Sequence, residues 1–285
     1  MKTTISNDFL QATILHKGAE LCSLKTLENE YIWDANPTFW SKHSPVLFPI
    51  VGTLKNNVYQ FENNQFQMFR HGFARDLNFN LVSKSNNEVS FSLKNSENTF
   101  SVYPFRFELI VTYILENKKL KILYNVLNLD DKTMPFSIGA HPAFSIKNDF
   151  KNYSLDFEFD EILEFFTLEQ DLLSDKTEKL RLIDKKMQLN YNLFKNDALV
   201  FKKLKSKTIA ISEYGKPFLI VNFHQFPNLG IWTKKDAPFI CIEPWFGFAD
   251  EILTSGKILE KNGIILLDKK SEWHAEFDIE IVKLC

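Results

Sequence analysis

The sequence predicts an all-β fold, a large sandwich of mostly antiparallel strands with few short helices. Phe is unusually abundant, with 28 in 285 residues, and with Ile, Val, Tyr and Trp it suits half-buried pleated surfaces. Short apolar and polar alternations are separated by turn residues along the chain. No window longer than about ten residues keeps a helical period, and no linker rich in Pro, Gly or Ser interrupts the sequence. We therefore expect one domain over residues 1–285.

The predicted strands follow one another in a meander from the N-terminus. They cover residues 10–15, 20–25, 30–33, 58–61, 66–69, 77–82, 89–93, 107–115, 119–126, 134–138, 197–201, 208–211, 218–221, 229–232, 239–243, 263–267 and 273–282. Segments 107–115 and 119–126 alternate with a period of two over about nine residues, which predicts a hairpin.

Three segments depart from this pattern. Residues 34–40 are expected to turn, with Pro37 opening a short helical piece. The apolar run 45–52 contains two prolines, which cannot donate to a β-ladder, so it cannot be a central strand throughout. Residues 148–186 are more charged and less periodic. Within them, 169–174 fits one helical turn and the acidic run 156–161 fits a solvated face.

Composition and charge exclude several classes of protein. Apolar residues make up 45% and charged residues 25%, as in ordinary globular proteins. The formal net charge of -2 gives no long-range attraction for nucleic acid and suits a neutral substrate. Cys22, Cys241 and Cys285 are odd in number and form no CxxC pair, which favours reduced thiols. Without a signal-peptide pattern or a run of about 18 apolar residues, we expect a soluble cytoplasmic protein that does not bind membranes.

Three stretches each place a titratable side chain at the end of an apolar run. His71 lies in stretch 69–75, His141 in 137–144 and Glu243 in 239–247. Each is followed at once by Gly or Pro, which ends a strand and exposes the side chain at its mouth. The sequence therefore predicts that three separate strands deliver two histidines and a glutamate to one site.

These residue types suit acid/base chemistry. The free pKa of His lies near neutrality, and shielding by Trp245 and Phe246 can raise the pKa of Glu243 toward the same range. The structural alternatives are a satisfied histidine at a strand end and a glutamate that caps a turn. The remaining histidines lack the same context and are assigned structural roles: His16, His43, His224 and His274.

Other chemistries have weaker support. A His/His/Glu metal site of the cupin type would use the same three side chains, but such sites usually bring two ligands from one strand as His-x-His, and this pair is missing from the sequence. The motifs GxSxG, GxxxxGK[ST] and GxGxxG are also missing, so serine hydrolase, P-loop and Rossmann interpretations are unsupported. We expect no metal and no cofactor.

Taken in order, the three stretches resemble the aldose 1-epimerase (galactose mutarotase-like) family, and its LacX-like branch in particular. The matching sequences are RHGFAR at 70–75, IGAHPAF at 138–144 and IEPWFG at 242–247. Supporting pieces are 45–52, 103–105, 196–199 and 229–233. The resemblance covers nearly the whole chain and implies a galactose mutarotase-like β-supersandwich.

The resemblance also implies interconversion of the α and β anomers of an aldose. Glu243 would be the general base at the C1 hydroxyl, and His141 the general acid at the ring oxygen. His71 would hydrogen-bond the ring-oxygen region, and Asp197 would hold sugar hydroxyls. Trp245, with Phe73 and Phe144, would present apolar faces to the sugar, although such aromatics are also common in cores.

One departure concerns the sugar-binding cation. Family members often carry an arginine after the position of Gly52, where this chain has Thr53-Leu54-Lys55. The candidates to replace it are Arg75, Lys55 and Arg70. With Lys42, they leave a phosphorylated aldohexose open as the substrate beside a free one. The chain is expected to act as a monomer or homodimer. The alternative function is a carbohydrate-binding or sugar-sensing protein with the same cleft and no turnover.

Overall fold

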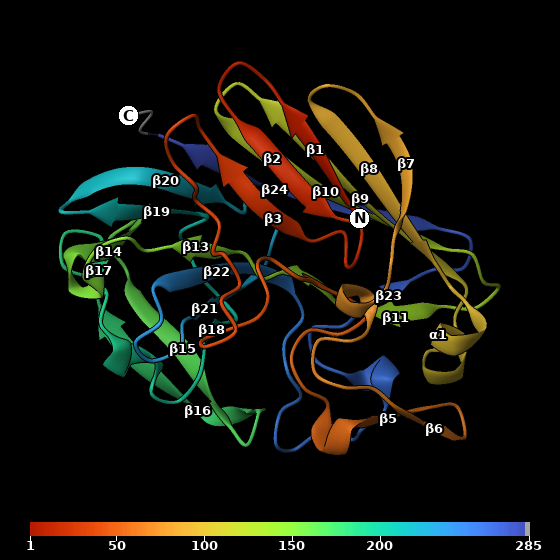
Figure 1. The fold of residues 1–285 in the computed structure, drawn as a ribbon. Coiled ribbons are helices and arrows are strands. Elements are labelled where there is room, and N and C mark those ends of the chain that lie inside the picture. The colour runs from red at the N-terminus through yellow and green to blue at the C-terminus, as the bar shows by residue number, and fades with distance from the viewer. Residues whose placement is uncertain (283–285) are drawn as a thin grey trace.

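The computed structural model describes residues 1–282, so Cys285 lies outside the described residues. The fold is built from antiparallel sheets, as predicted (Figure 1). A three-stranded sheet contains β1 (Lys2–Ser6), β2 (Gln11–Leu15) and β3 (Leu21–Lys25). Two small sheets pair β5 (Val58–Phe61) with β6 (Asn64–Gln67), and β11 (Met134–Phe136) with β23 (Ile265–Leu267).

A nine-stranded sheet forms one large layer. Its strands, in spatial order, are β17 (Lys186–Gln188), β14 (Tyr153–Phe157), β19 (Thr208–Glu213), β20 (Lys216–Asn222), β24 (Glu272–Ile281), β10 (Lys119–Asn128), β9 (Phe107–Glu116), β8 (Glu88–Lys94) and β7 (Asn80–Lys84). Strands β9 and β10 form the predicted hairpin. Their buried residues alternate with less buried ones, as expected when one face of a strand packs on the core.

An eight-stranded sheet forms the other large layer. Its strands, in spatial order, are β16 (Leu172–Arg181), β15 (Ile162–Glu169), β18 (Leu199–Phe201), β21 (Asn228–Trp232), β22 (Phe239–Phe246), β12 (Ile138–Ala140) and β4 (Val46–Leu47), and β13 (Ala143–Ser145) also pairs with β22. One buried apolar cluster includes Ile14 of β2, Val111 of β9 and Ile242 of β22, so all three sheets share a core.

Helices are few and short among the described residues. The α-helix is α1 (Glu97–Val102), and 3-10 turns are η1 (Lys55–Asn57), η2 (Ala74–Asp76), η3 (Phe150–Asn152), η4 (Tyr191–Phe194) and η5 (Ile258–Glu260). Within residues 1–282, no helix combines the length and apolar character needed to cross a bilayer.

Several local predictions were wrong, and one is the strand predicted at 77–82, which is β7 at 80–84. Residues 169–174 form the turn and flanks of the β15/β16 hairpin, and Gln170 and Asp171 both have positive φ there. Segment 30–33 makes only isolated bridges, because the Glu30 carboxylate accepts the N–H groups of Leu24 and Ile32. The strand predicted at 66–69 is β6 at 64–67. Residues 34–40 turn as expected but form no helix.

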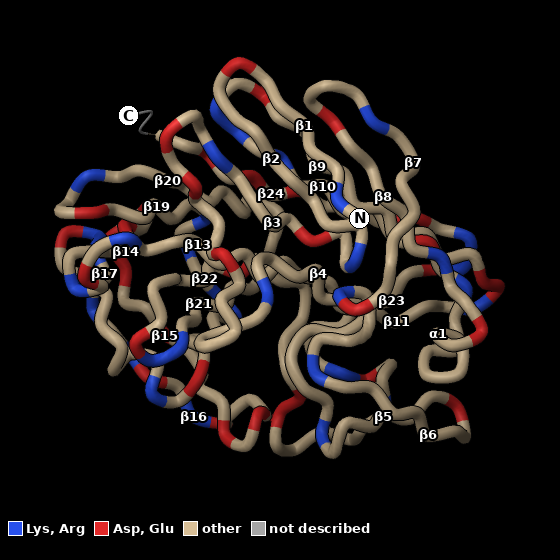
Figure 2. Tube along the Cα trace, viewed as in Figure 1, with Lys and Arg blue, Asp and Glu red and all other residues tan. Residues whose placement is uncertain are grey.

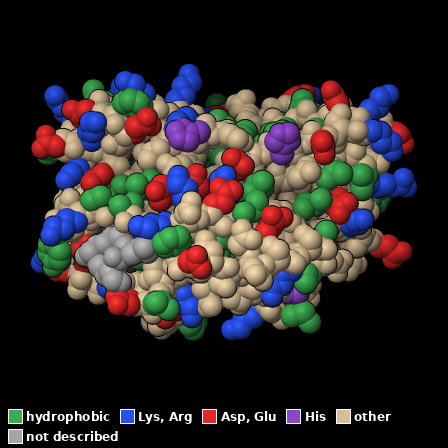
Figure 3. Space-filling model, turned by 90° about the horizontal axis from the view of Figure 1, so that it is seen from above, with side chains coloured by type: hydrophobic (Ala, Val, Ile, Leu, Met, Phe, Trp, Pro, Cys, Tyr) green, Lys and Arg blue, Asp and Glu red, His purple; other side chains and the backbone are tan. Residues whose placement is uncertain are grey.

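Charges of both signs are distributed over the described surface. Figure 2 shows basic and acidic residues interspersed along the chain, and Figure 3 shows them side by side across one face. This arrangement follows from the near balance of 34 basic and 36 acidic residues. It provides no extended positive surface on that face for a polyanion.

Candidate active site

A cavity of about 270 Å³ brings the predicted site residues together. Strands β15, β18, β21 and β22 each contribute to its wall through Leu168, Val200, Trp232 and Glu243. The remaining lining residues are Trp40, Gly52, Arg70, His71, Arg75, His141, Asp171, Asp197, Ala198, Trp245 and Ala249. His71, His141 and Glu243, which are far apart in sequence, therefore share one cavity.

His141, in the segment between β12 and β13, meets Glu243 because it lies opposite that residue of β22. Strand β12 pairs Gly139 with Trp245, and β13 pairs Ala143 with Cys241. Both pairs belong to one antiparallel register, which puts residue 141 opposite residue 243. Opposed side chains in such a pair have Cβ atoms about 4.5–5.5 Å apart. The His141 Nε2 atom lies 3.3 Å from Glu243 Oε2, at 10% and 1% side-chain exposure.

Burial favours the neutral forms of this pair. It raises the pKa of Glu243 well above its ordinary value, and the positive charge of Arg70 opposes that rise. Burial, with a further contribution from Arg70, lowers the pKa of His141 to about 3. The directions of both pKa shifts favour a pair with its proton on the carboxyl group over the ion pair. Moving that proton across the short contact gives the carboxylate and the imidazolium.

His71 is held as a neutral imidazole. Its φ of 70° is unusual for a residue with a side chain, and Gly72 follows with a φ of 69°. A Cβ at Gly72 would lie 2.3 Å from the Phe48 carbonyl oxygen, so only glycine fits there. The Gly52 N–H donates to His71 Nδ1 at 3.1 Å, and Arg70 Nε–H donates to Nε2 at 3.2 Å. Two facing donors oppose a doubly protonated ring, and burial likewise lowers its pKa well below the ordinary value.

Trp245 forms a flat floor beside Glu243. Gly139 and Gly230 lie on the strands either side of β22, and a Cβ at either would come within 2.4 Å of the indole. The ring therefore lies across both neighbouring strands, which only glycines allow. The buried Nε1–H lacks a partner of ordinary hydrogen-bond geometry within the described chain, and its proximity lowers the pKa of Glu243.

Two further tryptophans enclose the His141 ring. Trp40 stacks on it with ring centroids 4.7 Å apart, and Trp232 meets it edge-on at 5.6 Å. The backbone N–H of Trp40 donates to the Asn36 carbonyl at 3.0 Å and closes the turn that positions Trp40. The three tryptophans give the cavity broad apolar surfaces around its polar groups.

Paired charges lie at the edge of the cavity. Arg70 contacts Asp171 at 3.0 Å and Asp197 at 3.3 Å, so two carboxylates share one guanidinium. Asp197 has a φ of 70°, and the lining residues His71 and Asp171 also have positive φ. Arg75 Nη2 donates to the Arg70 carbonyl at 2.8 Å and braces the same segment.

A comparison with protein families identifies the family of the chain. The family model described as aldose 1-epimerase matches residues 1–265. The chain belongs to the aldose 1-epimerase family. Membership supports a mutarotase-type isomerase that acts on a sugar.

Similar proteins agree with membership of the aldose 1-epimerase family. Protein LacX (chromosomal) of Lactococcus lactis subsp. lactis is 35% identical over 276 residues, covering 91% of this chain and 92% of LacX. The galactose mutarotase related enzyme from Lactobacillus acidophilus has a TM-score of 0.94 at 32% identity, covering 99% of this chain and 98% of that one. A galactose mutarotase-like protein from Lactobacillus casei ATCC 334 gives 0.93 at 29%, covering 99% and 100%. The predicted galactose mutarotase-like fold is confirmed.

Three residues expected to contact the substrate do not line the cavity, and one of them, Phe73, packs against the main core instead. Lys55 donates its backbone N–H to Asp250 Oδ2 and its Nζ to the Ile252 carbonyl, which directs it away. Phe144 is 0% exposed and lies in the main core. Ala143 faces Cys241 on the cavity side, and alternation turns the next residue to the other face of the sheet. The other proposed residues line the wall: His71, His141, Glu243, Asp197, Arg70, Arg75 and Trp245.

Sequence reasoning missed Trp40, Trp232 and Asp171. Trp40 lay in a segment expected to turn and to open a short helical piece, and Trp232 stood inside an ordinary strand pattern. Asp171 was hidden by the helical prediction for 169–174. A possible signal for Asp171 was the polar Gln170-Asp171 pair between two alternating segments, which is typical of a hairpin turn.

Proposed function

We propose that the protein is an aldose 1-epimerase that interconverts the α and β anomers of a free, neutral aldohexose. The observation that carries the proposal is the contact between a buried carboxyl group and a buried imidazole, 3.3 Å apart in the wall of a cavity. An acid and a base must act together on the two oxygens bound to C1 of the sugar, and this pair can supply both.

In the proposed reaction, the Glu243 carboxylate takes the proton of the C1 hydroxyl while the His141 imidazolium protonates the ring oxygen. The bond between C1 and the ring oxygen breaks and leaves the open-chain aldehyde. Glu243 is then a carboxylic acid and His141 a neutral imidazole, the forms that burial favours. After rotation about C1–C2, Glu243 returns its proton to the carbonyl oxygen while His141 takes back the proton of the new hydroxyl group, and the ring closes on the other face.

His71 would act as a hydrogen-bond donor in this scheme. A neutral imidazole accepts at one ring nitrogen only, and in the sugar complex the rigid backbone N–H of Gly52 would keep that role for Nδ1, so the ring proton would lie on Nε2. The flexible Arg70 side chain would then make way for a sugar oxygen at that atom. This oxygen would accept from His71 and Arg70 together, and Asp197 would accept from sugar hydroxyls.

The cavity charges favour a neutral sugar over a phosphorylated one. Arg70 is already matched by two carboxylates, Asp171 and Asp197, which would repel a phosphate group. Lys42 pairs with Asp76 at 2.9 Å. We expect saturation-transfer NMR to show faster exchange for glucose or galactose than for the corresponding 6-phosphate at equal concentration. Faster exchange of the phosphate would contradict this assignment of substrate class.

The experiment that tests the function is the exchange rate of several aldoses with and without enzyme. Acceleration above the buffer rate for at least one neutral aldose supports the proposal. Calorimetric binding of a sugar with no acceleration for any of them would overturn it in favour of the carbohydrate-binding alternative.

The pH dependence of exchange is expected to be flat over a wide range. One proton is shared by Glu243 and His141 throughout the cycle, so activity needs that count to stay at one. A second proton is added only as pH falls to the lowered pKa of His141, about 3. The single proton is lost only as pH rises through the raised pKa of Glu243. A bell-shaped profile of exchange rate against pH, with its two limbs at the ordinary pKa values of Glu and His, would contradict this proton count.

Gly230→Ala is expected to disturb catalysis through Trp245. A Cβ there would lie 2.4 Å from the indole, and such overpacking costs about 1–3 kcal/mol of stability. The displaced Nε1–H would no longer favour the Glu243 carboxylate. Each 1.4 kcal/mol of lost stabilisation of the carboxylate costs about tenfold in rate, so kcat should fall roughly tenfold or more.

Trp245→Phe distinguishes this positioning role from a loss of packing, because it keeps a ring on the floor and removes the N–H. In both variants the pKa of Glu243 should rise further, and the alkaline limit of the activity plateau should move to higher pH. An unchanged alkaline limit in both would assign Trp245 a packing role alone.

A further inference from the structure

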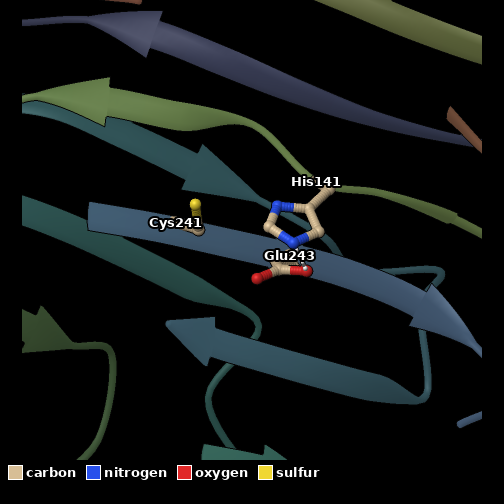
Figure 4. A group of neighbouring side chains, drawn as sticks. All are labelled: His141, Cys241 and Glu243. Atoms are coloured by element: carbon tan, nitrogen blue, oxygen red, sulfur yellow. Dashed lines mark ion pairs between the residues drawn. The ribbon is translucent and has the colours of Figure 1, made fainter. Parts of the chain in front are cut away.

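Three side chains of types that bind transition metals converge beside the cavity: His141, Cys241 and Glu243 (Figure 4). Each offers one ligand atom, and these atoms all lie within 4.8 Å of one another. In Figure 4 the imidazole ring lies over β22, and the sulfur and the carboxylate both come from that strand. The group therefore combines nitrogen, sulfur and oxygen at one point.

The sheet geometry explains this convergence. Cys241 and Glu243 are two residues apart on β22, so their side chains leave the same face. His141 comes from the segment between β12 and β13, opposite Glu243. The residue opposite Cys241 is Ala143, whose side chain is a single methyl group.

The polar atoms of the group have unused bonding capacity. Glu243 is 1% exposed, and Cys241 is 0% exposed. Neither Glu243 oxygen has a hydrogen-bond partner in the part of the chain that the structure describes, and the same holds for His141 Nδ1. Buried polar atoms without partners need an explanation, and a bound cation would supply one for the carboxylate.

The ligand set suits thiophilic divalent ions. Zn²⁺ binds Cys sulfur at about 2.3 Å and His nitrogen or carboxylate oxygen at about 2.0–2.2 Å, which puts ligand atoms on one ion about 3.3–3.8 Å apart. The contact between His141 and Glu243, at 3.3 Å, already meets this spacing. The widest separation, up to 4.8 Å, would close by about 1 Å through side-chain rotation. A fourth position would face the cavity.

We propose that His141, Cys241 and Glu243 bind one thiophilic divalent cation, Zn²⁺ or Cd²⁺, and that the bound ion inhibits the enzyme. Binding forms three bonds from the metal, to nitrogen, sulfur and oxygen. It releases two protons, one from the thiol and one from the His141–Glu243 pair. The ion then occupies the imidazole lone pair and the carboxylate that proton transfer requires. The inhibition rests on the proposed function, whereas the binding does not.

Cadmium titration of the chelator-treated full-length protein tests the binding. We expect one Cd²⁺ per chain and a sulfur-to-cadmium charge-transfer band in the ultraviolet. Loss of an outer-shell partner alone costs about 10–100-fold in metal affinity, so Cys241→Ala and His141→Asn should each weaken binding at least as much. Cys241→Ala should also abolish the band. Cys22→Ala and Cys285→Ala are matched controls that should keep both band and affinity.

Inhibition is tested by measuring the exchange rate of each variant with Zn²⁺ and again with EDTA. The quantity compared between variants is the rate with Zn²⁺ divided by the rate with EDTA. The ratio should fall roughly tenfold or more for wild type at saturating Zn²⁺ and stay near one for Cys241→Ala at the same concentration. A band that survives in Cys241→Ala, or that is lost in Cys22→Ala or Cys285→Ala, would overturn the site. Binding without slower exchange would overturn the inhibition. Binding by a protein that never accelerates exchange would support the site while the proposed function fails.

Discussion

Replacing Glu243 with glutamine is expected to slow anomeric exchange by roughly 10²–10⁴-fold, the usual contribution of a general base. The amide keeps the size of the carboxyl group but cannot accept the proton of the C1 hydroxyl. Because burial already favours the neutral carboxylic acid, the substitution should leave the fold and its thermal midpoint intact. Saturation-transfer NMR at saturating sugar measures the change as a loss of kcat.

The control for this substitution is Glu272→Gln. Glu272 is an exposed residue of β24 in the nine-stranded sheet, so the same chemical change there should leave the exchange rate unaltered. Exchange by Glu243→Gln within a factor of about two of wild type would remove Glu243 from the reaction. An equal loss in both variants would point to a general effect on the protein.

His141→Asn is expected to produce a loss of similar size, roughly 10²–10⁴-fold. Asparagine occupies part of the ring volume but cannot carry a proton to the ring oxygen. It also loses the stacking on Trp40, whose ring lies 4.7 Å from the imidazole. Because stacking on Trp40 contributes to packing, the free energy of unfolding should be measured by urea denaturation beside the exchange rate. His274→Asn, at an exposed position of β24, provides the matched control.

The double variant separates one coupled unit from two independent groups. When two residues act in the same proton transfer, losing the second costs little once the first is gone. The variant with both Glu243→Gln and His141→Asn should therefore be about as slow as the slower single variant. A loss equal to the product of the two single losses would show that the groups act in separate steps.

Most of what the sequence could predict came from two features: the alternation of apolar and polar residues in strands, and the Gly or Pro residues that follow the polar site residues. Period-two alternation located β9 and β10, since that hairpin has one buried face along its whole length. The Gly and Pro residues after His71, His141 and Glu243 singled out side chains that the fold then placed in one cavity. The family resemblance added roles that no local pattern contains.

Residues whose position depends on distant parts of the chain could not be predicted in this way. Trp40 reaches the cavity only because its turn packs against His141, a contact across about a hundred residues of sequence. Phe144 sits one residue from the cavity face, and only the register of β13 against β22 shows that it turns to the core. Lys55 was a plausible sugar-binding cation by its charge, but in the structure its ammonium group donates to the carbonyl of Ile252.

The opposed placement of residues 141 and 243 has a consequence for how the chain can vary. Side chains alternate along each strand, so inserting or deleting one residue between Gly139 and His141 would turn the imidazole away from the carboxyl group. Length changes are easier to accommodate at exposed turns, such as Glu62-Asn63 between β5 and β6, which touch no part of the cavity. We therefore expect insertions and deletions to be tolerated least in the short segments around residue 141, which hold the imidazole within proton-transfer distance of the carboxyl group.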